Sequence, residues 1–237
     1  MPYFQKEDCQ IYYETFGDSS KEALLMLHGN GENGAIFEKQ IAHFSKNYYV
    51  ITMDMRGHGK SSLGTTPLNF DVFSQDVLAM LDLLHMEQVH ILGFSDGGNT
   101  AIQFALSYGN RVKSIIANGA DLNTKGIKGH IQFFIVLAYW MIFVCSHCFH
   151  SLKKREQVMG LMVRYPHITY EQLETIEIPV LVLVGHKDMV KEEHSKSIAT
   201  HVKHGELVIL QGSHFIYKDC PQEYNQAIEK FLTSQGQ

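Results

Sequence analysis

Cysteine and clustered positive charge are both scarce in this chain of 237 residues. Its four cysteines are few for a disulfide-stapled secreted scaffold and fit a reducing compartment. The net charge of -5 is spread without a basic stripe, so nucleic acid is not an expected partner. The N-terminus lacks the basic and then apolar order of a secretion signal. We therefore expect a cytoplasmic globular protein, monomer or homodimer, in which 45% hydrophobic residues fill a substantial core.

The chain also lacks the side chains that a metal or redox centre needs around its one C-x-x-C motif. Cys145 and Cys148 form this motif without a second cysteine pair or well-placed histidines. The motif also lacks the strand and helix start that surround it in thioredoxin-like proteins. We predict no metal and no redox cofactor.

Only one long stretch lacks charged residues, from Ile131 to Phe149. Its 19 residues contain no Asp, Glu, Lys or Arg, which is about the length that a bilayer demands. Gln132, Ser146 and His147 interrupt it, and strand patterns of one sheet lie before and after it. A single crossing would put the two halves of that sheet on opposite sides of the membrane. We predict no transmembrane span and leave a peripheral membrane contact open.

Short runs rich in Val, Ile and Leu alternate along the chain with longer amphipathic stretches. This pattern predicts an α/β fold with a mostly parallel sheet covered by helices on both faces. The expected strands are Leu24–Leu27, Tyr49–Met53, Val89–Leu92, Ser114–Asn118, Val180–Val184 and Leu207–Leu210. The expected helices are Ile36–Phe44, Phe73–Leu84, Asn99–Ser107, Glu192–Val202 and Gln222–Leu232. Alternation from Tyr3 to Phe16 adds an antiparallel hairpin at one edge.

The alternation of strands and helices breaks once, over residues 121–175, where no buried strand pattern occurs. We expect a helical insertion there between two strands of the core. The core domain is then formed by residues 1–120 and 176–237.

Glycines after the first buried strand match a dinucleotide-binding fingerprint. Gly29, Gly31 and Gly34 spell G-x-G-x-x-G, and Asp54 lies 20 residues beyond the last glycine. A nicotinamide or flavin site would leave unexplained the nucleophile and base that follow later strands. The same glycines expose backbone N–H groups that can stabilise an oxyanion instead, so we predict no cofactor. Asp54 is expected to tie down the loop that follows it, together with Arg56.

A candidate nucleophile lies in "ILGFSDGG", between a strand and a helix start. Ser95 is the centre of a G-x-S-x-G motif, whose glycines allow the tight, strained turn that exposes a serine hydroxyl. In an open parallel sheet, ligands bind beyond the carboxyl ends of the strands, so the base and acid should also follow strands. His214 follows the last strand, and Asp188 follows the preceding one. Asp121, after an earlier strand, is the alternative acid.

Five segments together resemble the α/β-hydrolase fold superfamily: "LHGNGENG", "DMRGHGKSS", "GFSDGG", "VGHKDMV" and "GSHF". The resemblance runs in order from about Ile11 to Leu232, and the set is specific although each segment alone is not. It implies an eight-stranded type of sheet, a small helical cap over the active site at residues 121–175, and a cofactor-free serine hydrolase. The S-D-G-G form of the elbow is similar to the valacyclovir-hydrolase-like and small bacterial carboxylesterase branches.

The resemblance implies that Ser95 attacks an acyl carbon while His214 takes its proton and Asp188 orients the imidazole. The backbone N–H groups of Asn30 and Asp96 are the expected oxyanion hole. The leading prediction is a carboxylesterase-like enzyme that cleaves a small, largely apolar carboxylic ester through an acyl-enzyme intermediate. An amidase or aminopeptidase, a thioesterase, a lactonase and a carbon–carbon bond hydrolase would use the same triad. A ligand-binding receptor with little turnover is the non-enzyme alternative.

Substrate contacts are expected from the segment "LHGNGENG" (the oxyanion loop), from "GFSDGG" (the nucleophile elbow) and from the cap. The candidates are Glu32, Phe94, Phe134, Trp140 and Met162. Asp96 or Glu32 is a candidate to recognise a cationic amine, as in amino-acid esters. The alternative is that Asp96 only caps its helix and Glu32 points to water.

Overall fold

Eight strands form one sheet in the computed structural model, which describes residues 2–235. The strands are β1 (Tyr3–Lys6), β2 (Cys9–Phe16), β3 (Ala23–Leu27), β4 (Tyr49–Met53), β5 (Val89–Phe94), β6 (Val112–Asn118), β7 (Val180–Gly185) and β8 (Gly205–Leu210). Their order across the sheet is β1-β2-β4-β3-β5-β6-β7-β8. The β1–β2 and β2–β4 pairs are antiparallel, and all later pairs are parallel. The prediction of a mostly parallel α/β sheet with an antiparallel edge hairpin is confirmed.

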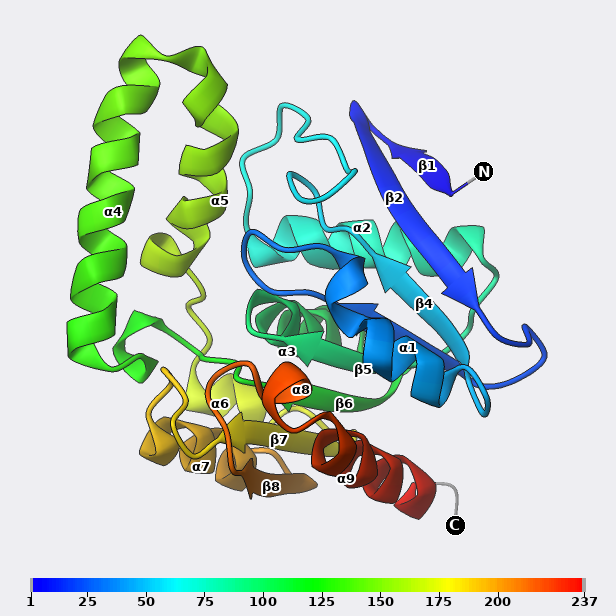
Figure 1. Ribbon diagram of the computed structural model, residues 1–237. Helices are drawn as coiled ribbons and strands as arrows, with labels where there is room; N and C mark the ends of the chain where they lie inside the picture. The colour runs from blue at the N-terminus through cyan, green and yellow to red at the C-terminus, as the bar shows by residue number, and fades with distance from the viewer. Residues whose placement is uncertain (1, 236–237) are drawn as a thin grey trace.

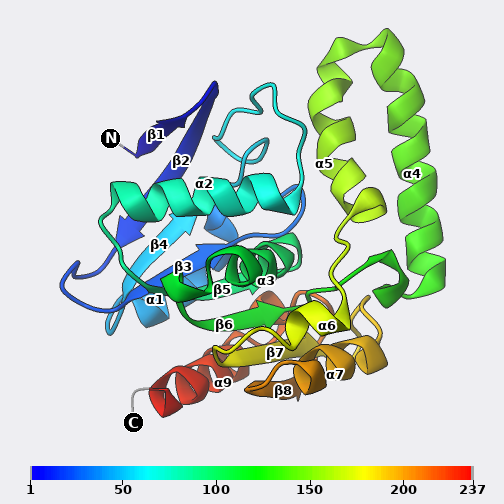
Figure 2. The ribbon, with the colours of Figure 1, turned by 180° about the vertical axis from the view of Figure 1, so that it is seen from behind.

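Helices cover both faces of the sheet (Figures 1 and 2). One face carries α1 (Glu38–Phe44), α8 (Ile216–Asp219) and α9 (Pro221–Ser234). The other carries α2 (Phe70–Leu83), α3 (Asp96–Tyr108) and α7 (Glu192–His201). A separate cluster of buried apolar side chains lies on each face. Strands β3, β5 and β7 are buried along their whole length, as expected for parallel strands covered on both sides.

Between β6 and β7 the chain forms helices and turns but no strand of the sheet. The helices of this stretch are η3 (Thr124–Gly126), α4 (Gly129–Cys148), η4 (His150–Leu152), α5 (Lys153–Arg164) and α6 (Tyr170–Leu173), where η marks a 3-10 helix. Helices α4 and α5 form a hairpin at one side of the molecule, with α5 between α4 and the sheet (Figure 1). The short α6 packs instead against α7 on the core.

Helix and strand bounds differ from the predicted ones mainly at the ends. The elbow helix α3 begins at Asp96 rather than Asn99, directly after the candidate nucleophile. Two further 3-10 helices, η1 (Gly34–Phe37) and η2 (Gly109–Arg111), lead into α1 and β6. The four-residue α8 was not predicted, because a single turn is too short to show helical periodicity.

Candidate active site

Ser95 lies at the sharp turn between β5 and α3. Its backbone has φ 52° and ψ -116°, a region that non-glycine residues rarely occupy. The turn fits because Gly97 lets the backbone of β3 approach closely: a Cβ atom there would lie 2.0 Å from the carbonyl oxygen of Leu27. This geometry is that of a nucleophile elbow.

His214 and Asp188 form a buried pair at the ends of the neighbouring strands β8 and β7. The Nδ1 atom of His214 lies 2.7 Å from Oδ1 of Asp188, and the two residues are 7% and 3% exposed. The same carboxylate oxygen accepts the backbone N–H of Val190 at 2.9 Å. Because Nδ1 donates to the carboxylate, Nε2 of the neutral ring is left without a proton and can act as a base. His214 and Ser95 line the same small cavity.

Gly119, directly after β6, supports the histidine and was missed in the sequence. It has φ +61°, and a Cβ atom there would lie 2.7 Å from Cε1 and 2.9 Å from Nδ1 of His214. The backbone at Gly119 therefore packs against the imidazole where a side chain would displace it. A glycine immediately after a buried strand was the available signal.

Phe94 packs against the other side of the imidazole. Its ring centroid lies 4.9 Å from that of His214 and 4.8 Å from that of Tyr217, and the side chain is 1% exposed. Phe94 was predicted to contact substrate. The structure instead buries it among these rings, where it positions His214.

Asp121, the alternative acid, pairs with Asn99 rather than with His214. Asn99 donates its side-chain N–H to Oδ1 of Asp121 at 3.1 Å and accepts the backbone N–H of Asp121 at 2.9 Å. Burial raises the pKa of Asp121 to about 7, opposed by the Asn99 hydrogen bond, with the nearby Asp96 raising it further. The carboxyl group that the structure bonds to the histidine is that of Asp188.

The two predicted oxyanion donors lie on segments joined through the Asn30 side chain. Its Nδ2 atom donates to Oδ2 of Asp96 at 2.8 Å and to the carbonyl of Val158 in α5 at 2.7 Å. Within residues 2–235, the backbone N–H groups of Asn30 and Asp96 have no hydrogen-bond acceptor in the protein. Burial raises the pKa of Asp96 to about 6, against the lowering effect of the Asn30 bond.

Glu32 holds the oxyanion loop in place through two hydrogen bonds. Its Oε2 atom accepts the backbone N–H of Gly29 at 3.1 Å, and Tyr217 donates to Oε1 at 3.1 Å. Burial raises the pKa of this carboxyl, although both bonds stabilise its charged form. Glu32 therefore neither points freely to water nor presents an unpaired carboxylate to substrate.

His28 and Asp54 fix the remainder of the glycine loop. Nδ1 of His28 donates to the carbonyl of Gly29 at 2.8 Å, and Nε2 accepts the backbone N–H of Met55 at 3.0 Å. Burial lowers the pKa of His28 to about 3, so the ring stays neutral. Asp54 accepts the backbone N–H groups of Gly34 and Lys60, both at 2.8 Å. The acid of the dinucleotide fingerprint is thus occupied within the protein.

Asp54 and Arg56 both hold the loop that follows β4, as expected, but they do so through different partners. Arg56 forms a bidentate pair with Asp76 of α2, in which Nε–Oδ2 is 2.9 Å and Nη2–Oδ1 is 2.7 Å. Asp54 contributes separately, by accepting the backbone N–H of Lys60.

A cleft of about 580 Å³ lies beside the contact between Asn30 and α5, and it shares the lining residue Met162 with the cavity at Ser95. Its lining includes Asn30, His58, Lys154, Arg155, Val158, Met159 and Met162. The free volume beside Ser95 is only about 10 Å³, room for a single water, and the neighbouring cleft is far larger.

His58, which lines this cleft, has one ring nitrogen that is buried without a partner within residues 2–235. Its Nδ1 atom donates to the carbonyl of Arg56 at 3.0 Å, and burial lowers its pKa to about 4. Its Nε2 atom has no hydrogen-bond partner among the described residues.

Met162 lines both spaces, as expected of a substrate contact, but Phe134 and Trp140 do not. These two side chains are 64% and 54% exposed, and neither lines the cleft or the cavity. The side of α4 that packs against α5 carries Tyr139 and Ser146, so Phe134 and Trp140 are turned outward. Phe134 and Trp140, predicted as substrate contacts, thus lie outside both spaces beside Ser95 and α5.

Comparison with known proteins identifies the family of the fold. A family model described as alpha/beta hydrolase fold matches residues 22–155. The curated protein 3-oxoadipate enol-lactonase 2 of Acinetobacter baylyi is 28% identical over 255 residues, covering 95% of this chain and 94% of its own. The putative carbamate hydrolase RutD of a Caulobacter species is 25% identical, with coverages of 95% and 97%.

A solved structure of Est816, described as an N-acyl homoserine lactone degrading enzyme, superposes with a TM-score of 0.81. It is 22% identical and covers 97% of this chain and 100% of its own. At this identity the likeness shows a shared fold.

Proposed function

The chain belongs to the α/β-hydrolase fold family, and from this and the geometry at Ser95 we propose that it is a serine hydrolase acting on carboxylic esters, lactones included. The observation that carries the proposal is the buried Asp188–His214 pair at 2.7 Å, whose imidazole lines one cavity with Ser95. A strained serine, a histidine with a free Nε2 atom and an orienting carboxylate are the three groups that acyl transfer requires. The enol-lactonase name of the 28% identical relative supports ester chemistry, since a lactone is a cyclic ester.

The proposed reaction proceeds in two steps. Nε2 of His214 takes the Ser95 hydroxyl proton as Oγ forms a bond to the acyl carbon, and the same proton then passes to the departing alkoxide. The backbone N–H groups of Asn30 and Asp96 stabilise the oxyanion, and one such donor is typically worth about 3 kcal/mol of barrier. Water, deprotonated by His214, then cleaves the acyl-enzyme and restores Ser95.

The cleft favours an acyl group with an apolar body and an anionic end. Apolar surface in the cleft comes from Val158, Met159 and Met162. The exposed Lys154 and Arg155 lie at the N-terminal end of α5, on the side of Val158 away from Met162 along the helix. Among the described residues, the lining of this cleft contains no acidic side chain. A carboxylate at the far end of the substrate would therefore meet two cations, whereas an amine would be repelled. This preference is opposite to the amine recognition considered from Asp96 and Glu32, whose oxygens accept bonds from Asn30, Gly29 and Tyr217.

Three p-nitrophenyl esters of similar length test this proposal: the monoester of succinate, the ester of butyrate and the ester of 4-aminobutyrate. We expect kcat/KM to fall in that order, by about tenfold between the anionic and cationic esters at low ionic strength. The double variant Lys154→Gln/Arg155→Gln should remove the difference, and Lys153→Gln, which lies outside the cleft lining, should keep it. Equal values for the three esters with the unaltered protein would contradict the anionic preference while leaving ester hydrolysis intact.

A lactone panel run beside the esters tests the bond that is cleaved. Ser95→Ala should abolish turnover of both open-chain esters and lactones, by on the order of a millionfold in kcat, without lowering the thermal stability. Turnover of esters that survives in Ser95→Ala would show that another group is the nucleophile. Turnover of amides or carbamates without esters would replace the proposed substrate class.

A further inference from the structure

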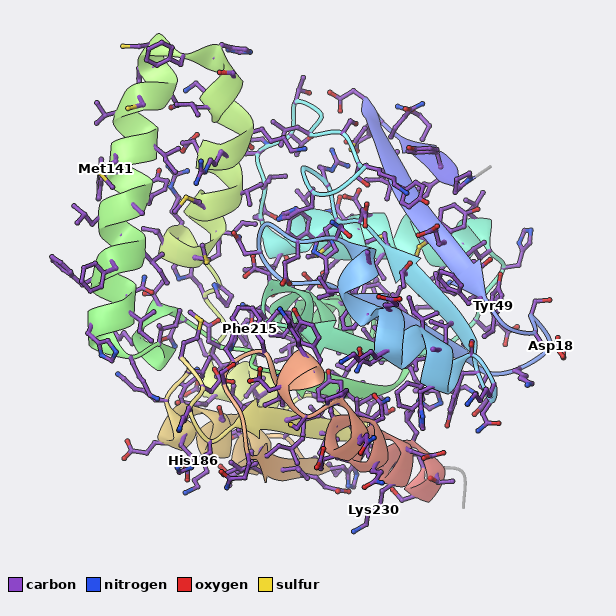
Figure 3. The ribbon with its side chains drawn as sticks, viewed as in Figure 1. Asp18, Tyr49, Met141, His186, Phe215 and Lys230 are labelled. Carbon is purple, nitrogen blue, oxygen red and sulfur yellow. The ribbon has the colours of Figure 1, made fainter. Side chains whose placement is uncertain are left out.

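A continuous apolar stripe runs along the outer side of α4. Its members recur at helical spacing, with exposed fractions from 47% for Leu137 to 64% for Phe133. They are Phe133, Phe134, Leu137, Trp140, Met141 and Val144. Figure 3 shows Met141 on the side of α4 that faces away from α5. An exposed apolar face of this extent marks an interaction surface.

The opposite side of α4 is fixed to α5 by polar contacts. Tyr139 is 3% exposed and donates to Oε1 of Glu156 at 3.1 Å, and Arg164 forms an ion pair with that same oxygen at 3.1 Å. Nearer the base of the hairpin, Gln132 donates to the carbonyl of Met162 at 3.2 Å. By length and composition α4 could cross a membrane, but crossing would break these contacts. As long as these contacts between α4 and α5 remain, the stripe can contact a surface only with α4 lying parallel to that surface, as one face of the hairpin.

Positive charge collects at both ends of the stripe. Residues 122–155 contain no Asp or Glu, in a chain whose net charge is -5. Their cations precede and follow α4: Lys125, Lys128, Lys153, Lys154 and Arg155. Cationic side chains that flank an exposed apolar face form the pattern that anionic lipid head groups attract.

We propose that the outer face of α4 docks onto an anionic lipid surface. The stripe enters the boundary between head groups and acyl chains, and Lys125, Lys128 and Lys153, which lie outside the cleft lining, contact lipid phosphates at its two ends. A second copy of the chain fits this face less well. In a two-fold pair of α4 helices, parallel or antiparallel, each cationic end meets a cationic end of the other copy, whereas lipid phosphates complement both ends at once.

Docking on this face has a consequence for access to the cleft. The helix α5 carries cleft-lining residues on its inner side and packs against α4 on the other. The lipid surface would therefore lie beside the hairpin that bounds the cleft.

Trp140 is the only tryptophan in the chain and lies on the stripe, so its fluorescence reports docking directly. The purified protein is mixed with vesicles of phosphatidylcholine alone or with added phosphatidylglycerol. With the anionic vesicles we expect a blue shift of Trp140 emission, quenching by brominated acyl chains and sedimentation of the protein with lipid. Binding should weaken on neutral vesicles and at high salt, because salt screens the lysine–phosphate attraction.

Variants separate the apolar and cationic contributions. Leu137→Gln with Val144→Gln should lower the partition coefficient by about tenfold or more, while Leu83→Gln should not change it. Leu83 on α2 is a matched control, since it is 47% exposed like Leu137. The triple variant Lys125→Gln/Lys128→Gln/Lys153→Gln should abolish the preference for anionic vesicles. All these variants should hydrolyse a water-soluble ester at the unaltered rate.

Three outcomes would overturn the proposal. One is unchanged Trp140 emission and no sedimentation with anionic vesicles. Another is equal partition onto neutral and anionic vesicles, which would remove the role of the cations. The third is a blue shift that grows with protein concentration in the absence of lipid and disappears in Leu137→Gln, which would assign the face to a second copy.

Discussion

Asp121 is a buried carboxyl group that lines the cavity at Ser95 and takes no part in the proposed proton transfer. Burial raises its pKa from 3.8 to about 7, so the folded protein favours the neutral acid. The unfolded chain loses this proton at much lower pH. Stability from Asp121 is therefore fully present below about pH 4 and is lost progressively as the pH rises to about 7.

Asp121→Asn should remove this pH dependence while keeping an oxygen for the Asn99 amide. A pKa difference of about three units between the folded and the unfolded protein corresponds to about 4 kcal/mol of unfolding free energy over the whole pH range. About 2 to 3 kcal/mol of this is lost between about pH 5 and about pH 8. We expect the variant to gain that much unfolding free energy over the unaltered protein at the higher pH, measured by urea denaturation. An identical difference between the two proteins at both pH values would show that Asp121 is not the neutral group inferred.

At this scale, residue types and their positions after strands were enough to single out Ser95, Asp188 and His214. Each follows a strand of a parallel sheet, and the carboxyl ends of such strands meet at one edge. The contacts of Asn30 with Asp96 and of Glu32 with Tyr217 could not be predicted, because each joins residues far apart in the chain through one particular rotamer. For the same reason Phe94 was assigned to the substrate instead of to the histidine.

At the scale of elements, a buried ion pair ties the loop after β4 to α2. Arg56 is 1% exposed and Asp76 is fully buried, and two hydrogen bonds join them. Removing one partner of such a pair leaves an uncompensated charge in the interior. This pair thus fixes the loop that borders the cleft at His58.

Asp76→Asn should cost about 3 to 5 kcal/mol of unfolding free energy, because the Arg56 guanidinium keeps its charge and loses its counter-ion. Chemical denaturation measures this loss. Glu177→Gln is the control: it removes an ion pair with Lys203 of 2.6 Å whose side chains are 69% and 54% exposed, and it should change stability little. If both variants lost an equally small amount of unfolding free energy, the buried Arg56–Asp76 pair would matter no more to stability than the exposed pair.

The hairpin of α4 and α5 has a feature that hydrophobic periodicity does not determine, namely which side of α4 faces outward. The uncharged stretch from Ile131 to Phe149 predicted a helix, and α4 occupies most of it. A helix that is apolar all round has no preferred buried face in its sequence, so its outward side could not be identified. Only the packing of α5 against Tyr139 and Ser146 decides that Phe134 and Trp140 face away from the site.

At the scale of the whole molecule, alternating strands and helices predicted the layered sheet, and the five sequence segments pointed to the same family. The order of the strands across the sheet could not be derived from the alternation itself, since it depends on which crossovers pack best. That order matters for the site. It brings β5, β6, β7 and β8 side by side, so the loops carrying Ser95, Gly119, Asp188 and His214 converge at one edge.

Covalent labelling of the intact protein with a fluorophosphonate tests the central claim most directly. The account predicts one stoichiometric adduct, located on Ser95 by peptide mass spectrometry, with labelling lost in Ser95→Ala and strongly slowed in His214→Ala. A matched control, Ser146→Ala in α4, should label like the unaltered protein. No adduct, or an adduct on a residue other than Ser95, would contradict the assignment of a serine nucleophile activated by the Asp188–His214 pair.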